Sequence, residues 1–176
     1  RSMTKSELKL IGILAKAFIN NVRVDDTYNE VLHEYGLMSI KDDDWVSVLT
    51  LNEVLTKLVE KRQSFESTYD MVAVGLRAAQ NADLPQDMTL IDFLTTQNPV
   101  IQEIYQGAGK GSVKMQTLSD THYILEVDLP WPDDLMYGNY YANIKRLLPA
   151  GTSFTLRKTQ ASNIEAGIPM IFEIEW

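Results

Sequence analysis

The chain has 176 residues, of which 45% are hydrophobic and 23% charged, a balance that predicts a folded globular domain with its own core. It contains no cysteine, which excludes disulfides, thiolate nucleophiles and zinc–thiolate sites. The net charge of −8 and the isoelectric point near 4.7 disfavour nucleic acid as a partner, because an acidic surface repels phosphate.

Periodicity divides the chain into a helical half at residues 3–106 and a sheet half at 112–176, within one domain over residues 3–176. Residues 1–2, before Met3, are typical of a cloning remnant. No apolar run reaches the roughly 18 residues of a membrane span, and no signal-peptide pattern opens the chain. We therefore expect a cytoplasmic protein without a membrane span.

In the first half, apolar residues recur at helical spacing. Capping-box patterns at residues 4–7 (TKSE) and 50–53 (TLNE) predict two helix starts. Gly75 lies inside a helical pattern, which indicates close packing against another backbone. The further helices are expected at residues 26–35, 68–81, 89–97 and 98–106.

The second half alternates apolar and polar residues as strands do. Residues 112–118 and 121–129 predict a hairpin, and Asp133-Asp134 begins a helix that Pro149 and Gly151 end. Two further strands are expected at residues 153–158 and 168–176. The predicted fold class is α+β, with a helical N-terminal half followed by a β-β-α-β-β antiparallel sheet and a helix packed on one face.

Two stretches superficially resemble ligand motifs. In GAGKGS (107–112), Lys110 precedes the last glycine and the flanks run from helix to strand, so the stretch does not match a phosphate loop. The three aspartates at 42–44 lack the alternating acids, central glycine and distal glutamate of a calcium loop. Negative charge at a helix start explains them better.

The two histidines, His33 and His122, have no spacing suited to a metal, and no nucleophile elbow is present. A hydrolase-type enzyme would need one of them joined in space to a carboxylate and a nucleophile. We expect no catalytic residues and no metal site, and favour a non-enzymatic protein.

Aromatic residues concentrate in and around the second half. Tyrosine and tryptophan combine a large apolar body with a polar tip, which suits pockets and interfaces as well as ordinary cores. Trp131 lies between two prolines, so we expect it to cover a sheet edge, close a cavity or meet a second subunit. The candidate ligand-binding residues are Tyr105, Tyr123, Trp131, Tyr137, Tyr141 and Phe154.

The C-terminal third resembles a known family. A strand ending in proline, a glycine-bearing helix at 138–148, the loop Glu165-Ala166-Gly167 and the strand Phe172-Glu173-Ile174 look like the end of the 4-vinyl reductase domain. That domain shares an α+β superfamily with haem nitric-oxide/oxygen-binding (H-NOX) domains and TRAPP vesicle-tethering subunits. The resemblance implies ligand sensing or assembly between helices and sheet.

The chain departs from both cofactor-binding branches of that superfamily. The vinyl-reductase branch usually carries cysteines that could bind metal, and this chain has none. The resemblance to the haem branch implies a histidine in the middle of the chain and a Tyr-x-Ser-x-Arg clamp, and His33 and His122 lie in other segments. We therefore expect no cofactor, with haem disfavoured.

The favoured function is a sensory or regulatory domain that binds a small, mainly apolar ligand between helices and sheet. The alternative is a protein–protein interaction or dimerisation module without a ligand, and a hydrolase-type enzyme is a weaker alternative. The expected partners are an unidentified small apolar ligand or a protein, with a homodimer as one arrangement.

Overall fold

The structure is a computed structural model that describes residues 8–22, 27–63, 70–107 and 111–176. It confirms the predicted α+β class. The predicted capping box at 4–7 lies outside the described residues.

The elements in chain order are β1 (Lys9–Ile11), α1 (Gly12–Val22), α2 (Thr27–Glu34), β2 (Trp45–Ser47), α3 (Val48–Gln63), α4 (Met71–Gln80), α5 (Leu90–Thr95), α6 (Gln97–Ile104), β3 (Tyr105–Gln106), β4 (Ser112–Ser119), β5 (His122–Asp128), α7 (Asp133–Leu147), β6 (Thr155–Gln160) and β7 (Met170–Glu175).

The second half forms a four-stranded antiparallel sheet in the order β4-β5-β7-β6. Burial alternates along β5 and β7, so one face of the sheet is buried and the other is open. Helix α7 lies on the buried face, where the Tyr140 ring lies 5.4 Å from the Phe172 ring. This half matches the predicted β-β-α-β-β order.

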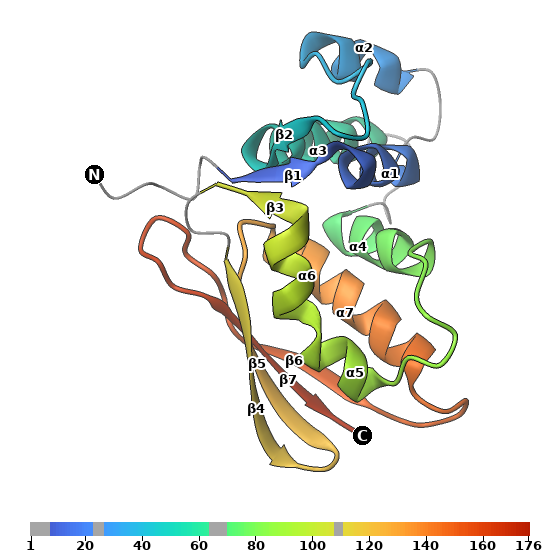
Figure 1. Cartoon of the computed structure of the whole chain (residues 1–176), viewed down its shortest axis with the longest axis vertical. Helices are drawn as coiled ribbons and strands as arrows, with labels where there is room; N and C mark the ends of the chain where they lie inside the picture. Colours follow the sequence, from blue (N-terminus) through green and yellow to red (C-terminus); the bar gives the residue numbers. More distant parts are fainter. Residues whose placement is uncertain (1–7, 23–26, 64–69, 108–110) are drawn as a thin grey trace.

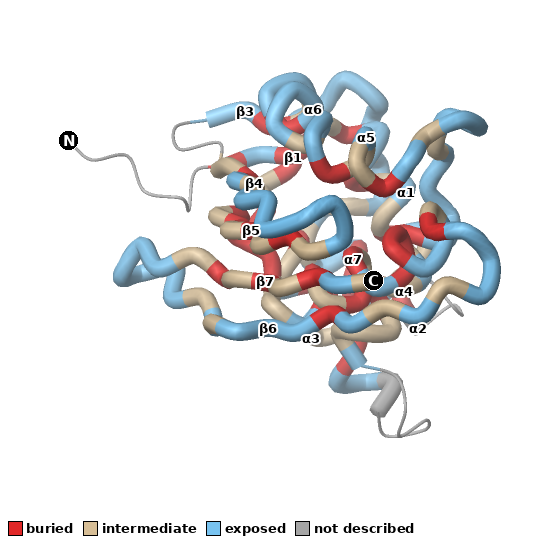
Figure 2. The backbone as a smooth tube through the Cα atoms, turned by 90° about the horizontal axis from the view of Figure 1, so that it is seen from below, coloured by how far each residue is buried: buried red, intermediate tan, exposed pale blue. Residues whose placement is uncertain are grey.

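The first half contains a second sheet that the periodicity does not predict. It has three strands in the order β2-β1-β3, all antiparallel. Its inward side chains, Leu10, Val46 and Tyr105, are all buried. Figure 1 shows this sheet with α1, α2 and α3 at one end of the molecule and the four-stranded sheet at the other. In Figure 2 the buried segments lie mainly in the interior of the molecule, and the exposed segments lie around its outside.

Helices α4 and α7 cross at two glycines. A Cβ on Gly75 would lie 1.9 Å from the Leu135 carbonyl oxygen, and a Cβ on Gly138 would lie 2.1 Å from the Val72 carbonyl oxygen. Neither helix could approach the other this closely with a larger residue. The close packing predicted from Gly75 is therefore confirmed.

Two helix starts differ from the prediction. Helix α3 begins at Val48, and the backbone N–H of Thr50 donates to Ser47 Oγ (3.4 Å), so the TLNE pattern lies inside the helix. Helix α6 begins at Gln97, one residue before the predicted start at 98, and the Asn98 side chain bonds to strand β4. In the described part of the chain, no helix combines the length and apolar content needed to cross a bilayer.

Candidate functional site

The two halves meet at the loop Leu129-Pro130-Trp131-Pro132 between β5 and α7. Trp131 is 5% exposed, and its Nε1–H donates a hydrogen bond of 2.6 Å to the Tyr105 hydroxyl. Its ring lies 5.2 Å from the Phe18 ring of α1. The Asn52 Nδ2 group of α3 donates to the Pro130 carbonyl oxygen at 2.6 Å. We call Trp131, Tyr105 and Phe18, with the bond from Asn52, the junction.

Trp131 is therefore buried between the two halves of this chain. The sequence predicted that it covers a sheet edge, closes a cavity or meets a second subunit. The prolines on either side explain why it belongs to neither a helix nor a strand. Its indole contacts two elements of the helical half, α1 and β3, a third element, α3, bonds to the neighbouring Pro130 carbonyl, and the loop is covalently joined to the sheet half. A substitution at Trp131 thus alters the contacts that join the two halves.

Tyr140 of α7 is a second buried phenol near the junction. It is 1% exposed, donates to the Gln97 side-chain oxygen at 2.6 Å and packs against Phe93 and Phe172. Burial raises the pKa of Tyr105 to about 12 and raises the pKa of Tyr140 beyond its ordinary range. Both phenols are therefore neutral at physiological pH, with Tyr105 accepting from Trp131 and Tyr140 donating to Gln97.

The six predicted ligand-binding residues do not form one site. Tyr105 and Trp131 lie at the junction. Tyr137, Tyr141 and Phe154 form a separate group between α7 and β6, in which Tyr141 is 37% exposed. Tyr123 stacks on Trp176 at a ring separation of 5.4 Å. No sequence pattern points to Phe18 and Asn52, which complete the junction from helices far away along the chain.

The histidines lie away from the junction. His33 is exposed in the last turn of α2. His122 is on the open face of the four-stranded sheet, where its Nε2 lies 2.7 Å from Glu173 Oε1. Arg157 donates to the other Glu173 oxygen at 2.8 Å. A chain of side-chain contacts across three strands, from His122 through Glu173 to Arg157, accounts for this group as cross-strand pairing.

This group predicts acid sensitivity. The hydrogen bond from His122 and the charge of Arg157 hold the pKa of Glu173 below its ordinary value. A depressed pKa means that the stabilisation is present above the unfolded-state pKa and is lost as pH falls through the folded-state pKa. The melting temperature of Glu173→Gln should therefore fall less than that of the unmodified chain when the pH is lowered from about 7 to about 3.

Thermal melts across that range check this prediction. Glu175→Gln is the matched control, because Glu175 is an exposed carboxylate on the same strand and the same open face. An unchanged acid dependence in Glu173→Gln, or the same change in both variants, would contradict it.

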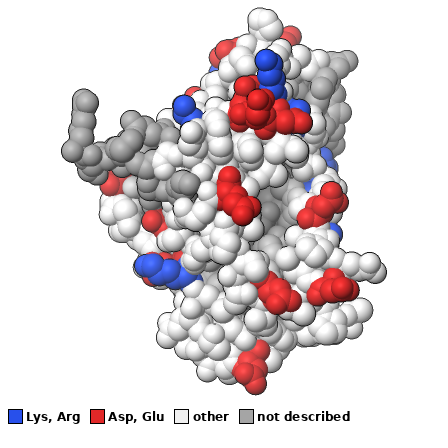
Figure 3. All heavy atoms as spheres, in the orientation of Figure 1, with Lys and Arg blue, Asp and Glu red and all other residues white. Residues whose placement is uncertain are grey.

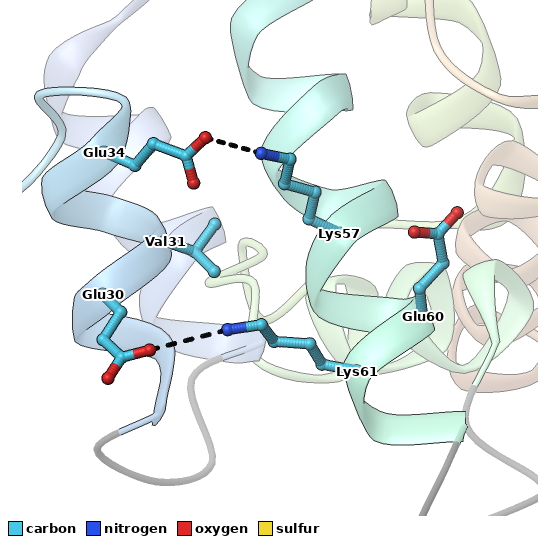
Figure 4. Close-up of a pocket in the computed structure, with 6 residues that line it drawn as sticks. All are labelled: Glu30, Val31, Glu34, Lys57, Glu60 and Lys61. Carbon is cyan, nitrogen blue, oxygen red and sulfur yellow. Dashed lines mark hydrogen bonds and ion pairs between the residues drawn. The ribbon is translucent and has the colours of Figure 1, made fainter.

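A surface pocket of about 290 Å³ lies between α2 and α3 (Figure 4). Lys57 pairs with Glu34 at 2.7 Å and Lys61 pairs with Glu30 at 3.8 Å, and both pairs are largely exposed. Exposed pairs of this kind contribute little net stability. Lys57 and Lys61 therefore lie on a solvated face of α3. The residues that line the pocket are Glu30, Val31, Glu34, Lys57, Glu60 and Lys61.

Comparison with known proteins finds likeness in structure only. No protein-family model and no curated protein matches the chain. An oxygen-binding H-NOX domain related to soluble guanylate cyclases superposes with a TM-score of 0.73 at 14% identity, covering 94% of each chain. A T. tengcongensis H-NOX variant gives 0.70 at 14%, covering 94% of this chain and 97% of the other. A structure described as modulating haem redox potential through porphyrin distortion gives 0.71 at 12%, covering 95% and 100%.

The chain thus has the fold of H-NOX domains, as the resemblance in its C-terminal third implies for that branch of the superfamily. The prediction of no cofactor, with haem disfavoured, is contradicted by these neighbours, whose names describe haem proteins. That prediction depended on short linear motifs. At 12–14% identity a fold persists where such motifs do not, so their absence was a weak guide.

The side chains at the junction give a separate test of whether haem iron could be ligated there. Among the described residues, neither histidine lies there, and the buried oxygens at the junction side chains are the Tyr105 phenol, which burial keeps protonated, and the neutral amide oxygen of Asn52. Haem iron is usually held by imidazole, thiolate, thioether or ionised phenol. The described junction residues therefore do not fit an iron ligated by imidazole or phenolate. Within the described residues, no group of three His, Asp or Glu side chains could hold a metal ion either.

Proposed function

We propose that this protein is a non-enzymatic sensory domain of the H-NOX fold, which binds a small, mainly apolar ligand at the junction beside Trp131 and Tyr105. The observation that carries this proposal is the buried, hydrogen-bonded Trp131–Tyr105 pair at the point where the two halves meet. Ligand sites are typically apolar and aromatic, with a few polar groups that orient the ligand. Such a pair supplies both kinds of contact.

The geometry suits a sensor because the junction side chains are already in contact. A ligand that enters there must separate Trp131 from Tyr105 or from Phe18, so binding alters a contact between the sheet half and either β3 or α1 of the helical half. A ligand changes the state of a protein only through differential contacts with its conformations. The junction provides such contacts to both halves at once.

Haem is the cofactor in the names of the structural neighbours, and it is therefore the first ligand to test. Its apolar macrocycle belongs to the proposed ligand class. Because the described junction residues do not fit iron ligation by imidazole or phenolate, binding would depend on the macrocycle and not on the iron. The chain's own contribution would be packing by Trp131 and Phe18 and a hydrogen bond from the neutral Tyr105 hydroxyl.

Quenching of tryptophan fluorescence tests the proposal, with hemin and iron-free protoporphyrin IX as probes. Porphyrins absorb where tryptophan emits, so a bound macrocycle should quench the nearby Trp131. We expect saturable quenching with one equivalent of either probe. Trp131→Phe should lose most of the signal and Trp45→Phe should keep it, because Trp45 lies on the surface, 37% exposed.

The two probes separate packing from metal ligation. Similar affinities for hemin and protoporphyrin IX are expected if the junction packs against the macrocycle alone. Linear, unsaturable quenching, or equal loss of signal in both variants, would contradict the proposed site. A far tighter complex with hemin would contradict the assignment of donors and indicate an iron ligand elsewhere.

A further inference from the structure

The hydroxyl of Tyr105 at the junction has a proton that its known bond does not use. It accepts the Trp131 indole N–H at 2.6 Å, and an indole N–H can only donate. Within the described residues, this hydroxyl donates to no acceptor, and Tyr105 is 5% exposed. The junction therefore contains a buried hydrogen-bond donor that is not in use.

Asn52 of α3 adds an unused acceptor. Its Nδ2 group donates to the Pro130 carbonyl at 2.6 Å, and because a carbonyl oxygen can only accept, this bond fixes which end of the amide faces the loop. The amide oxygen, Oδ1, is buried and has no hydrogen-bond partner in the described part of the chain. The donor and the acceptor lie beside one loop, since Trp131 and Pro130 are adjacent residues.

Such groups need an explanation, because buried polar atoms in folded proteins are nearly always hydrogen-bonded and leaving one without a partner costs free energy. Among the described side chains, two more buried oxygens lack a partner, on Asn29 of α2 and Asn143 of α7. Neither belongs to the junction. At the junction a donor and an acceptor occur together, so one bound molecule can satisfy both.

The four side chains of the junction carry no charge. Figure 3 shows charged side chains on the surface instead, with acidic groups spread over one face and a dense group near β2 and α1. An ionised group buried among Phe18, Asn52, Tyr105 and Trp131 would have no opposite charge to compensate the loss of its water. The part of a ligand that enters the junction should therefore be neutral.

We propose that the junction selects a neutral, mainly apolar molecule that carries both a hydrogen-bond acceptor and a donor, as a carboxamide or a hydroxy-ketone does. The Tyr105 hydroxyl donates to the acceptor, Asn52 Oδ1 accepts from the donor, and the rings of Trp131 and Phe18 pack on the apolar part. This inference rests on the proposed function, because it concerns the same site.

Isothermal titration calorimetry with three probes of nearly the same shape tests it. The probe 2-isopropenylnaphthalene has neither polar group, 2-acetylnaphthalene has the acceptor, and 2-naphthamide has the acceptor and the donor. In the unmodified chain, 2-naphthamide should bind at least as tightly as the hydrocarbon, although water solvates the amide far better. This comparison needs no variant, so it does not depend on whether a variant folds.

Substitution of Asn52 tests the acceptor. Asn52→Leu should weaken the binding of 2-naphthamide about tenfold more than that of the other two probes, as expected for one lost hydrogen bond. The response of the hydrocarbon measures any effect of losing the bond to Pro130. Asn143→Leu is the matched control, because it removes a buried oxygen without a partner from α7, and it should leave all three affinities unchanged.

The donor is tested in a Trp131→Phe background, because Tyr105→Phe alone would free the indole N–H to act as a donor in its place. Adding Tyr105→Phe to Trp131→Phe should weaken 2-acetylnaphthalene and 2-naphthamide about tenfold and leave 2-isopropenylnaphthalene unchanged. Tyr140→Phe is the control, because the Tyr140 hydroxyl already donates to Gln97.

Three results would overturn the inference. Equal responses of all three probes to every variant would show that the polar groups play no part in binding. An amide that binds more weakly than the hydrocarbon to the unmodified chain would show that its polar groups find no partners at the junction. If none of the probes binds, the inference fails, and the proposed function fails with it only if protoporphyrin IX also leaves the fluorescence of Trp131 unquenched.

Discussion

Replacing Gly75 or Gly138 with alanine should lower the free energy of unfolding by about 3 kcal/mol, near the upper end of the usual cost of overpacking. The reason is the crossing of α4 and α7. Each new Cβ would lie about 2 Å from a backbone carbonyl oxygen, that of Leu135 for Gly75 and that of Val72 for Gly138. Backbone atoms cannot rotate aside as a side chain can, so the helices must move apart and their packing is lost.

Urea unfolding measures this effect, and Gly151→Ala is the control. Gly151 has a positive φ of 84° but no neighbouring atom within 4 Å, so alanine there costs only the backbone strain, about 1–2 kcal/mol. If Gly138→Ala costs no more than Gly151→Ala, the helices do not approach as closely as described. The double variant should cost less than the sum, because either change alone already separates the helices.

Replacing Trp131 with alanine should cost about 4 kcal/mol of unfolding free energy, in the range typical of buried tryptophan. The change removes the ring packed on Phe18 and the donor that satisfies the Tyr105 hydroxyl. Tyr105→Phe should cost about 2 kcal/mol, since it leaves the buried indole N–H without an acceptor. Trp131 should thus be among the most sensitive positions outside the helix crossing.

Trp45→Ala is the matched control, because it removes the same ring from a site that is 37% exposed, and it should cost clearly less. Substitutions that remove the two partners of the Trp131–Tyr105 hydrogen bond should also be coupled. In a double-mutant cycle, Trp131→Phe with Tyr105→Phe should cost less than the sum of the single changes. Additive costs would show that the hydrogen bond between the two rings contributes little.

Local signals in the sequence predicted elements well where nothing distant competes with them. Thr89 caps α5 through a box with Asp92, and α7 ends before Pro149 and Gly151 as expected. The TLNE pattern wrongly predicted a helix start at Thr50, because the Oγ of Ser47, the last residue of β2, already accepts the hydrogen bond from the Thr50 N–H. Strands β1 and β3 were missed because two or three residues carry no measurable periodicity.

The site could be predicted only in part. Aromatic content pointed to Trp131 and Tyr105, but these residues are 26 apart in the sequence, and no pattern indicates that they bond. Tyr137, Tyr141 and Phe154 were equally good candidates by composition and lie elsewhere. Which aromatic residues meet is decided by how the two halves pack, and that is a tertiary property.

The most direct test of the proposed ligand site is the indole N–H region of the NMR spectrum, recorded with protoporphyrin IX. The chain has three tryptophans, so three signals report on three separate places. Binding at the junction should shift or broaden the Trp131 signal, because its Nε1–H is bonded to Tyr105, and leave those of Trp45 and Trp176 in place. A Trp131 signal that stays unchanged at saturating probe, or moves less than the other two, would contradict the proposal.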